Sequence, residues 1–246
     1  MLFLLLLPAA LLFWKTPAPE EVGGRPRFSA RFAWAALAYF ALYLAATFKA
    51  HFIASAAGLW LFQFVIPLLL MRVLREDKGA SCFRWSGAFK DLKPVLWACL
   101  LLLPLVFVVR DSSQVLGLFR SGGILLFLPL SAAAMLLLAA FWEEYFFRGI
   151  LQASIRRLTG SAAAAVGLSA LFFALYHFPM RYLNPNSSCY LDAGKALAEN
   201  LNEHLAMGLL LGFAVHRTRN VWTGVWLHSF INGLSSAGQV SSWIKF

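Results

Sequence analysis

The stretch LLLAAFWEEYFFR, residues 136–148, places two glutamates inside an otherwise apolar run. The two acids are Glu143 and Glu144, and they have only apolar and aromatic neighbours until Arg148. Similar apolar runs recur along the 246-residue chain, which is 61% hydrophobic and only 13% charged. A soluble globule of this size cannot bury so much apolar surface, whereas a lipid bilayer does not require its burial. The sequence therefore predicts an all-α, polytopic transmembrane helix bundle.

About eight segments are apolar enough to be helical spans of one integral membrane protein. We expect this protein to lie in the bacterial or archaeal cytoplasmic membrane. The first segment is short and could be a signal-peptide core, but it lacks a positively charged n-region, so we expect a retained helix. The seventh is also short, and we expect it to begin earlier, within the amphipathic stretch 191–205. The predicted spans are 2–14, 30–50, 54–72, 94–109, 123–147, 162–178, 205–216 and 221–240.

The formal net charge is +10, yet the basic residues lie at the ends of apolar runs and form no patch in the sequence. We therefore expect no nucleic-acid partner. Cytoplasmic loops of membrane proteins are enriched in Lys and Arg. This rule makes the segments after spans one, three, five and seven cytoplasmic and puts both termini outside. These segments contain Lys15, Arg25, Arg27, Arg31, Arg72, Arg75, Lys78, Arg84, Lys90, Lys93, Arg148, Arg156, Arg157, Arg217 and Arg219.

The paired glutamates need an explanation, because an ionised group at membrane depth costs about 3 kcal/mol on insertion scales. Glu144 and Arg148 are four residues apart on a predicted helix, with the acid on the N-terminal side, which favours an ion pair. This pair accounts for Glu144 as a structural brace. It leaves Glu143 without a partner, so we expect a partner from another helix.

Two histidines are candidate partners for Glu143. His177 and His228 lie within apolar runs, whereas His51, His204 and His216 lie near span ends, where a hydrated histidine needs no explanation. Glu143 and His177 lie equally far on either side of Gly160, so an antiparallel hairpin turning there brings them to the same depth.

A fourth polar residue joins this set from the last span. His228 and Asn232 are four residues apart and share one helix face. Glu143, His177, His228 and Asn232 can therefore converge from three helices. A carboxylate and a neutral imidazole can activate one water molecule as general base. A second histidine and an asparagine amide can donate hydrogen bonds to a developing oxyanion. Such a cluster suits amide hydrolysis by direct attack of water, with no serine or cysteine nucleophile.

Three motifs carry a resemblance to a known family. Residues 143–148 match EExxxR, residues 173–177 match FxxxH and residues 228–232 match HxxxN. Together, in this order, they resemble the CPBP family of CAAX proteases and bacteriocin-processing enzymes, also called the ABI family. The resemblance covers about residues 123–240. We therefore divide the chain into N-terminal transmembrane helices without an assigned role (1–122) and a CPBP-like catalytic core (123–246).

The resemblance implies a glutamic-type intramembrane protease similar to the Ras-converting CAAX endopeptidase, which cleaves near a lipidated C-terminus. By this resemblance Glu143 and His177 would activate the water, and His228 and Asn232 would form the oxyanion site. Glu144 and Arg148 would orient and brace the first motif. The implied partners are the bilayer and a protein or peptide whose C-terminal region is membrane-anchored or lipidated. No cofactor is implied.

Other functions remain open on the sequence. Two histidines and a glutamate could bind zinc, although the chain lacks an HExxH helix and its three cysteines lack metal-ligand spacing, so we expect no metal. The cluster could instead only hold helices together in a non-catalytic immunity or assembly protein. A proton-coupled transporter could use Glu143 and His177 as a relay, but the two halves of the chain show no repeat.

Overall fold

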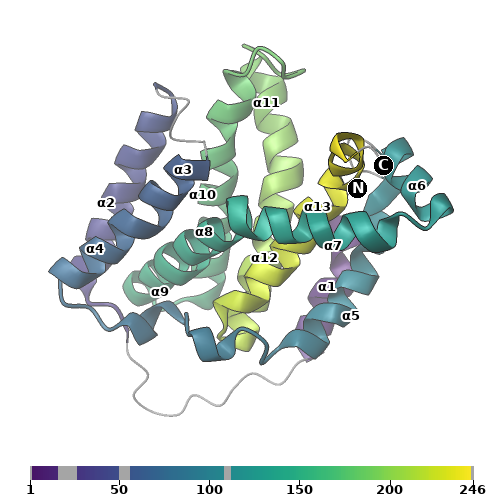
Figure 1. Ribbon diagram of the computed structural model, residues 1–246. Coiled ribbons are helices and arrows are strands. Elements are labelled where there is room, and N and C mark those ends of the chain that lie inside the picture. The colour runs from purple at the N-terminus through teal and green to yellow at the C-terminus, as the bar shows by residue number, and fades with distance from the viewer. Residues whose placement is uncertain (1, 16–26, 50–55, 108–111, 245–246) are drawn as a thin grey trace.

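The computed structural model describes residues 2–15, 27–49, 56–107 and 112–244, and within these ranges every regular element is a helix (Figure 1). The all-α fold is therefore as predicted. Arg25, His51 and the predicted span ends at 50, 54–55 and 108–109 lie outside the described residues.

The chain begins with α1 (Leu2–Lys15) and α2 (Ala30–Thr47). A third helix is continuous through α3 (Ala56–Leu59), the π-helical turn η2 (Trp60–Val65) and α4 (Ile66–Val73). Short 3-10 turns lead to α5 (Leu92–Leu102), η5 (Leu103–Phe107) and α6 (Ser112–Ser121). The remaining helices are α7 (Ile124–Met135), η6 (Leu136–Ala140), α8 (Phe141–Glu144), η7 (Tyr145–Gln152), α9 (Ala153–Thr159), α10 (Ala162–Tyr182), α11 (Ala193–Asn200), η8 (Leu201–Leu205), α12 (Ala206–Thr218) and α13 (Val221–Trp243).

The helix that carries the paired glutamates extends beyond the predicted apolar span 123–147. It runs without a break from Ile124 to Thr159, up to the predicted turn at Gly160. The polar residues after this apolar span stay helical because carbonyl groups of α12 satisfy their side chains. Arg148 Nη2 donates to the Gly208 carbonyl at 3.4 Å, and Gln152 Nε2 donates to the Gly212 carbonyl at 3.0 Å.

The predicted hairpin turn lies at Gly160. This glycine has a φ of 66° and caps α9 by donating its N–H to the Arg156 carbonyl. A left-handed residue directly after a helix is the usual way to end it, and glycine adopts that conformation without steric cost. Ser161 then caps α10, its hydroxyl accepting from the N–H of Ala164. The two arms therefore run antiparallel, as the spacing of Glu143 and His177 required.

Two other segments bear on the predicted spans. The helix of the predicted seventh span begins before its apolar part, as expected, because α11 and η8 continue directly into α12. The segment 112–121, which lies between the predicted spans 94–109 and 123–147, forms the additional helix α6. Its polar residues keep the mean hydropathy low, so a search for apolar runs does not find it.

Aromatic side chains form the core next to the glutamates. Phe146 and Phe147 are fully buried on η7. Tyr43 of α2 meets the Phe146 ring edge-on, and its own ring stacks on Tyr176 of α10 at a centroid distance of 5.4 Å. These contacts lock η7 between α2 and α10, so the helix segment beside Glu143 has a fixed position.

Small residues let α7 cross α13 closely (Figure 1). A Cβ atom added at Gly233 would lie 2.7 Å from the Ala132 Cα, and the Ser131 hydroxyl donates to the Gly233 carbonyl at 2.8 Å. Small residues at helix crossings are typical of membrane bundles, where association depends on close packing rather than on hydrophobic burial. This crossing fixes the position of α13, which carries two predicted site residues.

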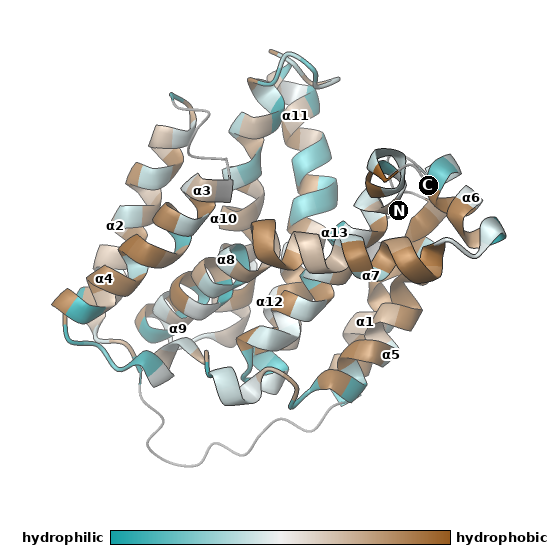
Figure 2. Cartoon of the chain, viewed as in Figure 1, coloured by the Kyte–Doolittle hydropathy of each residue, from teal (hydrophilic) through white to brown (hydrophobic). Residues whose placement is uncertain are grey.

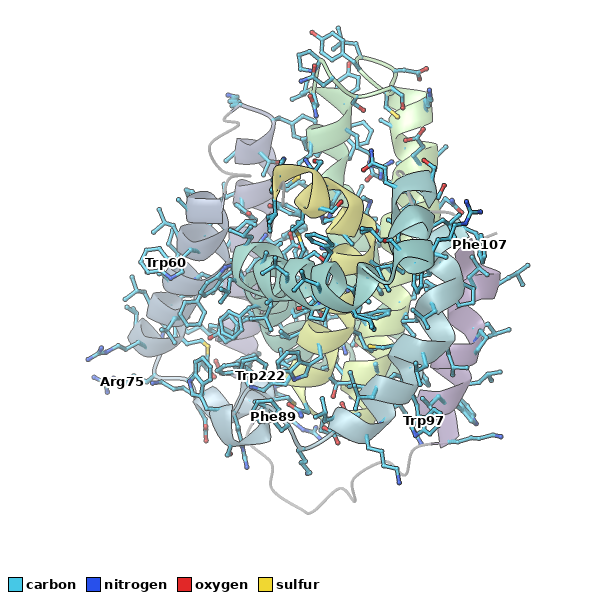
Figure 3. All side chains as sticks on the ribbon, turned by 45° about the vertical axis from the view of Figure 1, so that its right-hand side comes forward. Trp60, Arg75, Phe89, Trp97, Phe107 and Trp222 are labelled. Atoms are coloured by element: carbon cyan, nitrogen blue, oxygen red, sulfur yellow. The ribbon has the colours of Figure 1, made fainter. Side chains whose placement is uncertain are left out.

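Hydrophobic residues predominate along many helices of the bundle (Figure 2), and many large apolar side chains are exposed. Trp60, Trp97 and Phe107 are about half exposed or more and lie at the periphery in Figure 3, whereas Trp222 is 6% exposed and packs in an aromatic cluster with Phe83. Large apolar side chains facing outward are expected where lipid replaces water as solvent.

Three described helices are long and apolar enough to cross a membrane, namely Ala30–Thr47, Ile124–Thr159 and Ala162–Tyr182, and a fourth is added if α5 and α6 form one bent span. The full number of eight spans stays a prediction. The lower count has a physical reason, because polar and charged side chains lower the mean hydropathy of the continuous helix α11–α12 and of α13.

Candidate active site

Glu143 lies between two histidines from two other helices. It is 5% exposed on α8. Its Oε1 is 4.0 Å from Nε2 of His177 on α10, and its Oε2 is 3.7 Å from Nε2 of His228 on α13. Both distances exceed a direct hydrogen bond, and a polar pair at this separation is commonly bridged by water. The two histidines that the sequence offered as partners of Glu143 therefore both lie beside its carboxylate.

The other ring nitrogen of His177 is held by its own helix. Its Nδ1 lies 2.8 Å from the carbonyl oxygen of Phe173, which has no proton to give, so Nδ1 carries the hydrogen. In the neutral ring, Nε2 is then the acceptor, and this is the atom that faces Glu143. The Phe173 ring lies 4.5 Å from the Arg148 guanidinium carbon and 5.8 Å from the His228 ring, so this residue separates the polar groups of three helices.

Glu144 is more than a brace for Arg148. Its Oε1 is 3.0 Å from Arg148 Nη1, as the spacing predicted, and it also lies 2.9 Å from His228 Nδ1. Glu144 is completely buried and His228 is 1% exposed. A carboxylate on Nδ1 fixes the plane of the imidazole and leaves Nε2 directed to the other side. The carboxylate of Glu144 therefore joins the first motif to the third.

Gly224 provides the space for this carboxylate. A Cβ atom added at Gly224 would lie only 2.5 Å from Glu144 Oε2 and 2.9 Å from a methyl carbon of Val215. Any side chain on this position of α13 would displace the Glu144 carboxylate. Sequence patterns gave no indication of this role, because a glycine in an apolar helix is compatible with many kinds of close packing.

Asn232 is half-buried on α13, one turn beyond His228. Among the described residues, its side-chain amide has no hydrogen-bond partner. Five of the six predicted site residues are therefore linked by polar contacts of 4.0 Å or less. Asn232 makes no such contact with them and only shares a helix face with His228.

The structure brings His204 into the cluster, which the sequence did not predict. Its ring, on η8, stacks on the His177 ring at a centroid distance of 4.0 Å and an interplanar angle of 19°. Its buried Nδ1 has no hydrogen-bond partner. His204 lies in an amphipathic stretch near a span end, where sequence position alone gave it an interfacial role. Only the packing of the continuous helix α11–α12 against α10 shows that the His204 ring lies on the His177 ring.

Within the described part of the chain, no group of three or more His, Cys, Asp or Glu side chains has an arrangement that could hold a metal ion. The three cysteines, Cys82, Cys99 and Cys189, form no disulfide bond.

These features define a helical integral membrane protein with a buried acid–histidine cluster. A family model described as Type II CAAX prenyl endopeptidase Rce1-like matches residues 125–234. The chain therefore carries an Rce1-like CAAX protease domain in this segment, in agreement with its resemblance to the CPBP family. All six predicted site residues lie inside the matched segment. No curated protein and no solved structure matches the chain.

The match of this segment to the family model implies a protease that acts on a membrane-associated protein substrate.

Proposed function

We propose that the chain is a glutamic-type intramembrane endopeptidase that hydrolyses a peptide bond near the lipidated or otherwise membrane-anchored C-terminus of a protein. The observation that carries this proposal is the position of Glu143, buried between the Nε2 atoms of His177 and His228. A structural ion pair needs one partner in direct contact. Two imidazoles, each slightly beyond direct hydrogen-bond distance, leave room for a water molecule on the carboxylate.

In this mechanism the Glu143 carboxylate accepts a proton from a water molecule that also donates to His177 Nε2. The hydroxide equivalent attacks the scissile carbonyl carbon, and the oxygen of that carbonyl takes the negative charge. The proton on Glu143 then passes to the leaving nitrogen as the C–N bond breaks. The Phe173 carbonyl keeps His177 in the tautomer that can accept from water.

The oxyanion would lie toward α13. In the protonated imidazolium form of His228, Nδ1–H donates to Glu144 and Nε2–H can donate to the developing negative charge. The Asn232 amide, one turn away and without a described partner, supplies the second donor. Glu144 and Arg148 are positioning residues in this scheme, because they act through His228 and through the helix that holds Glu143.

His204 is proposed to position the His177 ring. His204→Ala removes one stacked face and is expected to lower kcat about tenfold with little change in KM, because misplacement of a catalytic group slows the chemical step. His204→Phe keeps a flat ring at this place and is expected to restore most of the rate. The melting temperature of both variants is measured as well, so that a loss of rate can be distinguished from a loss of folding. A His204→Phe variant as slow as His204→Ala would show that the imidazole nitrogens matter instead.

The proposal includes the predicted topology of about eight spans, with residues 1–122 as supporting helices. It is supported by the convergence of all four predicted cytoplasmic segments at one end of the bundle, where Arg27, Arg84, Arg157 and Arg219 line a common cavity. Substrates would approach with their lipid anchor in the bilayer, because many large apolar side chains on the bundle are exposed.

A pair of peptides tests the proposed substrate class. The purified full chain in lipid vesicles is incubated with one peptide sequence, made with and without a prenyl group on a cysteine near its C-terminus. We expect cleavage of the prenylated peptide at least about tenfold faster, because the anchor concentrates it in the bilayer. Cleavage of neither peptide would favour a non-catalytic membrane partner. Loss of cleavage on addition of a zinc chelator would favour the metalloenzyme.

A further inference from the structure

A second polar feature lies at the bundle end that is predicted to face the cytoplasm. It is a cavity of about 590 Å³, and its wall comes from all four predicted cytoplasmic segments. No Asp or Glu is among the described residues that line it. Its outer cations are Arg27, Arg84, Lys90, Arg156, Arg157 and Arg219.

The deep end of this cavity is lined by two buried polar residues of the site helix. Arg148 is 2% exposed and Gln152 is 7% exposed. The Nε–H of Arg148, a donor, is buried without a hydrogen-bond partner. Buried polar atoms normally have partners, so each such atom calls for one. Arg148 also contacts Glu144, so it borders both the cavity and the candidate active site.

Ordinary cytoplasmic charges do not explain this arrangement. Lysines and arginines that only set topology can spread over the surface, as the exposed Arg72 and Lys78 do, neither of which lines the cavity. Arg156 is instead half-buried and lines one cavity together with other basic side chains. Gathering like charges around a partly enclosed space is unfavourable unless an anion occupies it.

We propose that this cavity binds a phosphate-bearing anion. Arginine is well suited to phosphate, since its planar guanidinium can give two parallel hydrogen bonds. The phosphate could come from the headgroup of an anionic phospholipid, because the cavity lies where the cytoplasmic leaflet is expected, or from a soluble phosphate compound. Binding does not depend on proteolysis and is measured without a substrate.

The test compares two charge-matched double variants of the full chain. Arg156→Gln/Arg157→Gln removes two cations from the cavity, and Arg72→Gln/Lys78→Gln removes two cations from the same end outside it. Each protein is titrated with phosphatidylglycerol in phosphatidylcholine nanodiscs, and separately with inorganic phosphate in detergent. Binding is followed by the melting temperature and by the lipid retained in mass spectrometry.

We expect the wild type and the Arg72→Gln/Lys78→Gln variant to bind alike, and the Arg156→Gln/Arg157→Gln variant to bind at least about tenfold more weakly, since each basic residue contributes to the attraction. A response to phosphatidylglycerol alone identifies the lipid source, and an equal response to inorganic phosphate identifies a soluble one. The proposal is overturned if neither probe binds, or if both double variants bind equally well.

Discussion

Replacing Glu143 with glutamine is expected to lower the rate of peptide cleavage at least about 10³-fold. Glutamine keeps the size of the side chain but cannot take a proton from water, and general-base catalysis typically contributes 10²–10⁴-fold. Glu143 has no arginine in direct contact, so the melting temperature should change little. The initial rate of cleavage of a prenylated fluorescent peptide measures the effect.

Glu203→Gln is the matched control for this variant. It also removes one carboxylate, from an ion pair with Arg181 on a partly exposed side chain. Exposed ion pairs contribute little to stability, so this variant should cleave at nearly the wild-type rate. If Glu143→Gln retained more than about a tenth of the rate while the control was normal, Glu143 would not be the general base.

Replacing Glu144 with glutamine is expected to abolish cleavage and also to destabilise the fold. Removing one partner of a buried ion pair leaves the other charge uncompensated, which costs about 3–5 kcal/mol. Here the remaining charge is Arg148, whose side chain is completely buried. The melting temperature in detergent should fall by several degrees or more.

A double variant separates the two roles of Glu144. Glu144→Gln/Arg148→Met removes both charges and should regain most of the lost stability, because no buried cation remains unpaired. Cleavage should stay absent, because His228 still lacks the carboxylate on Nδ1. Recovery of cleavage together with stability would reduce Glu144 to a brace for Arg148 and would remove it from the proposed mechanism.

The placement of Glu143 opposite His177 followed from sequence because both features that determine it are local. Gly160 ends α9, and helices of equal rise return the chain to the same depth. The motifs also predicted that His228 would come to the same place. Their spacing could not show which carboxylate each nitrogen of His228 faces, because that depends on how α13 is rotated against α8.

The sequence did not show why the site helix continues past its apolar span. A charged residue at 148 suggests the end of an apolar span, yet the helix continues to Thr159 because the Gly208 and Gly212 carbonyls accept from Arg148 and Gln152. Such partners come from a helix about 60 residues later in the chain. His204 was missed for the same reason, since its stacking on His177 depends on the packing of η8 against α10.

The most direct test of the account is the mass of the products formed from one prenylated peptide in vesicles that contain either the wild type or Glu143→Gln. The account predicts that the wild type yields two fragments whose masses together equal that of the peptide plus one water, whereas Glu143→Gln leaves the peptide intact. An unchanged peptide with the folded wild type, or equal formation of fragments by both proteins, would contradict it.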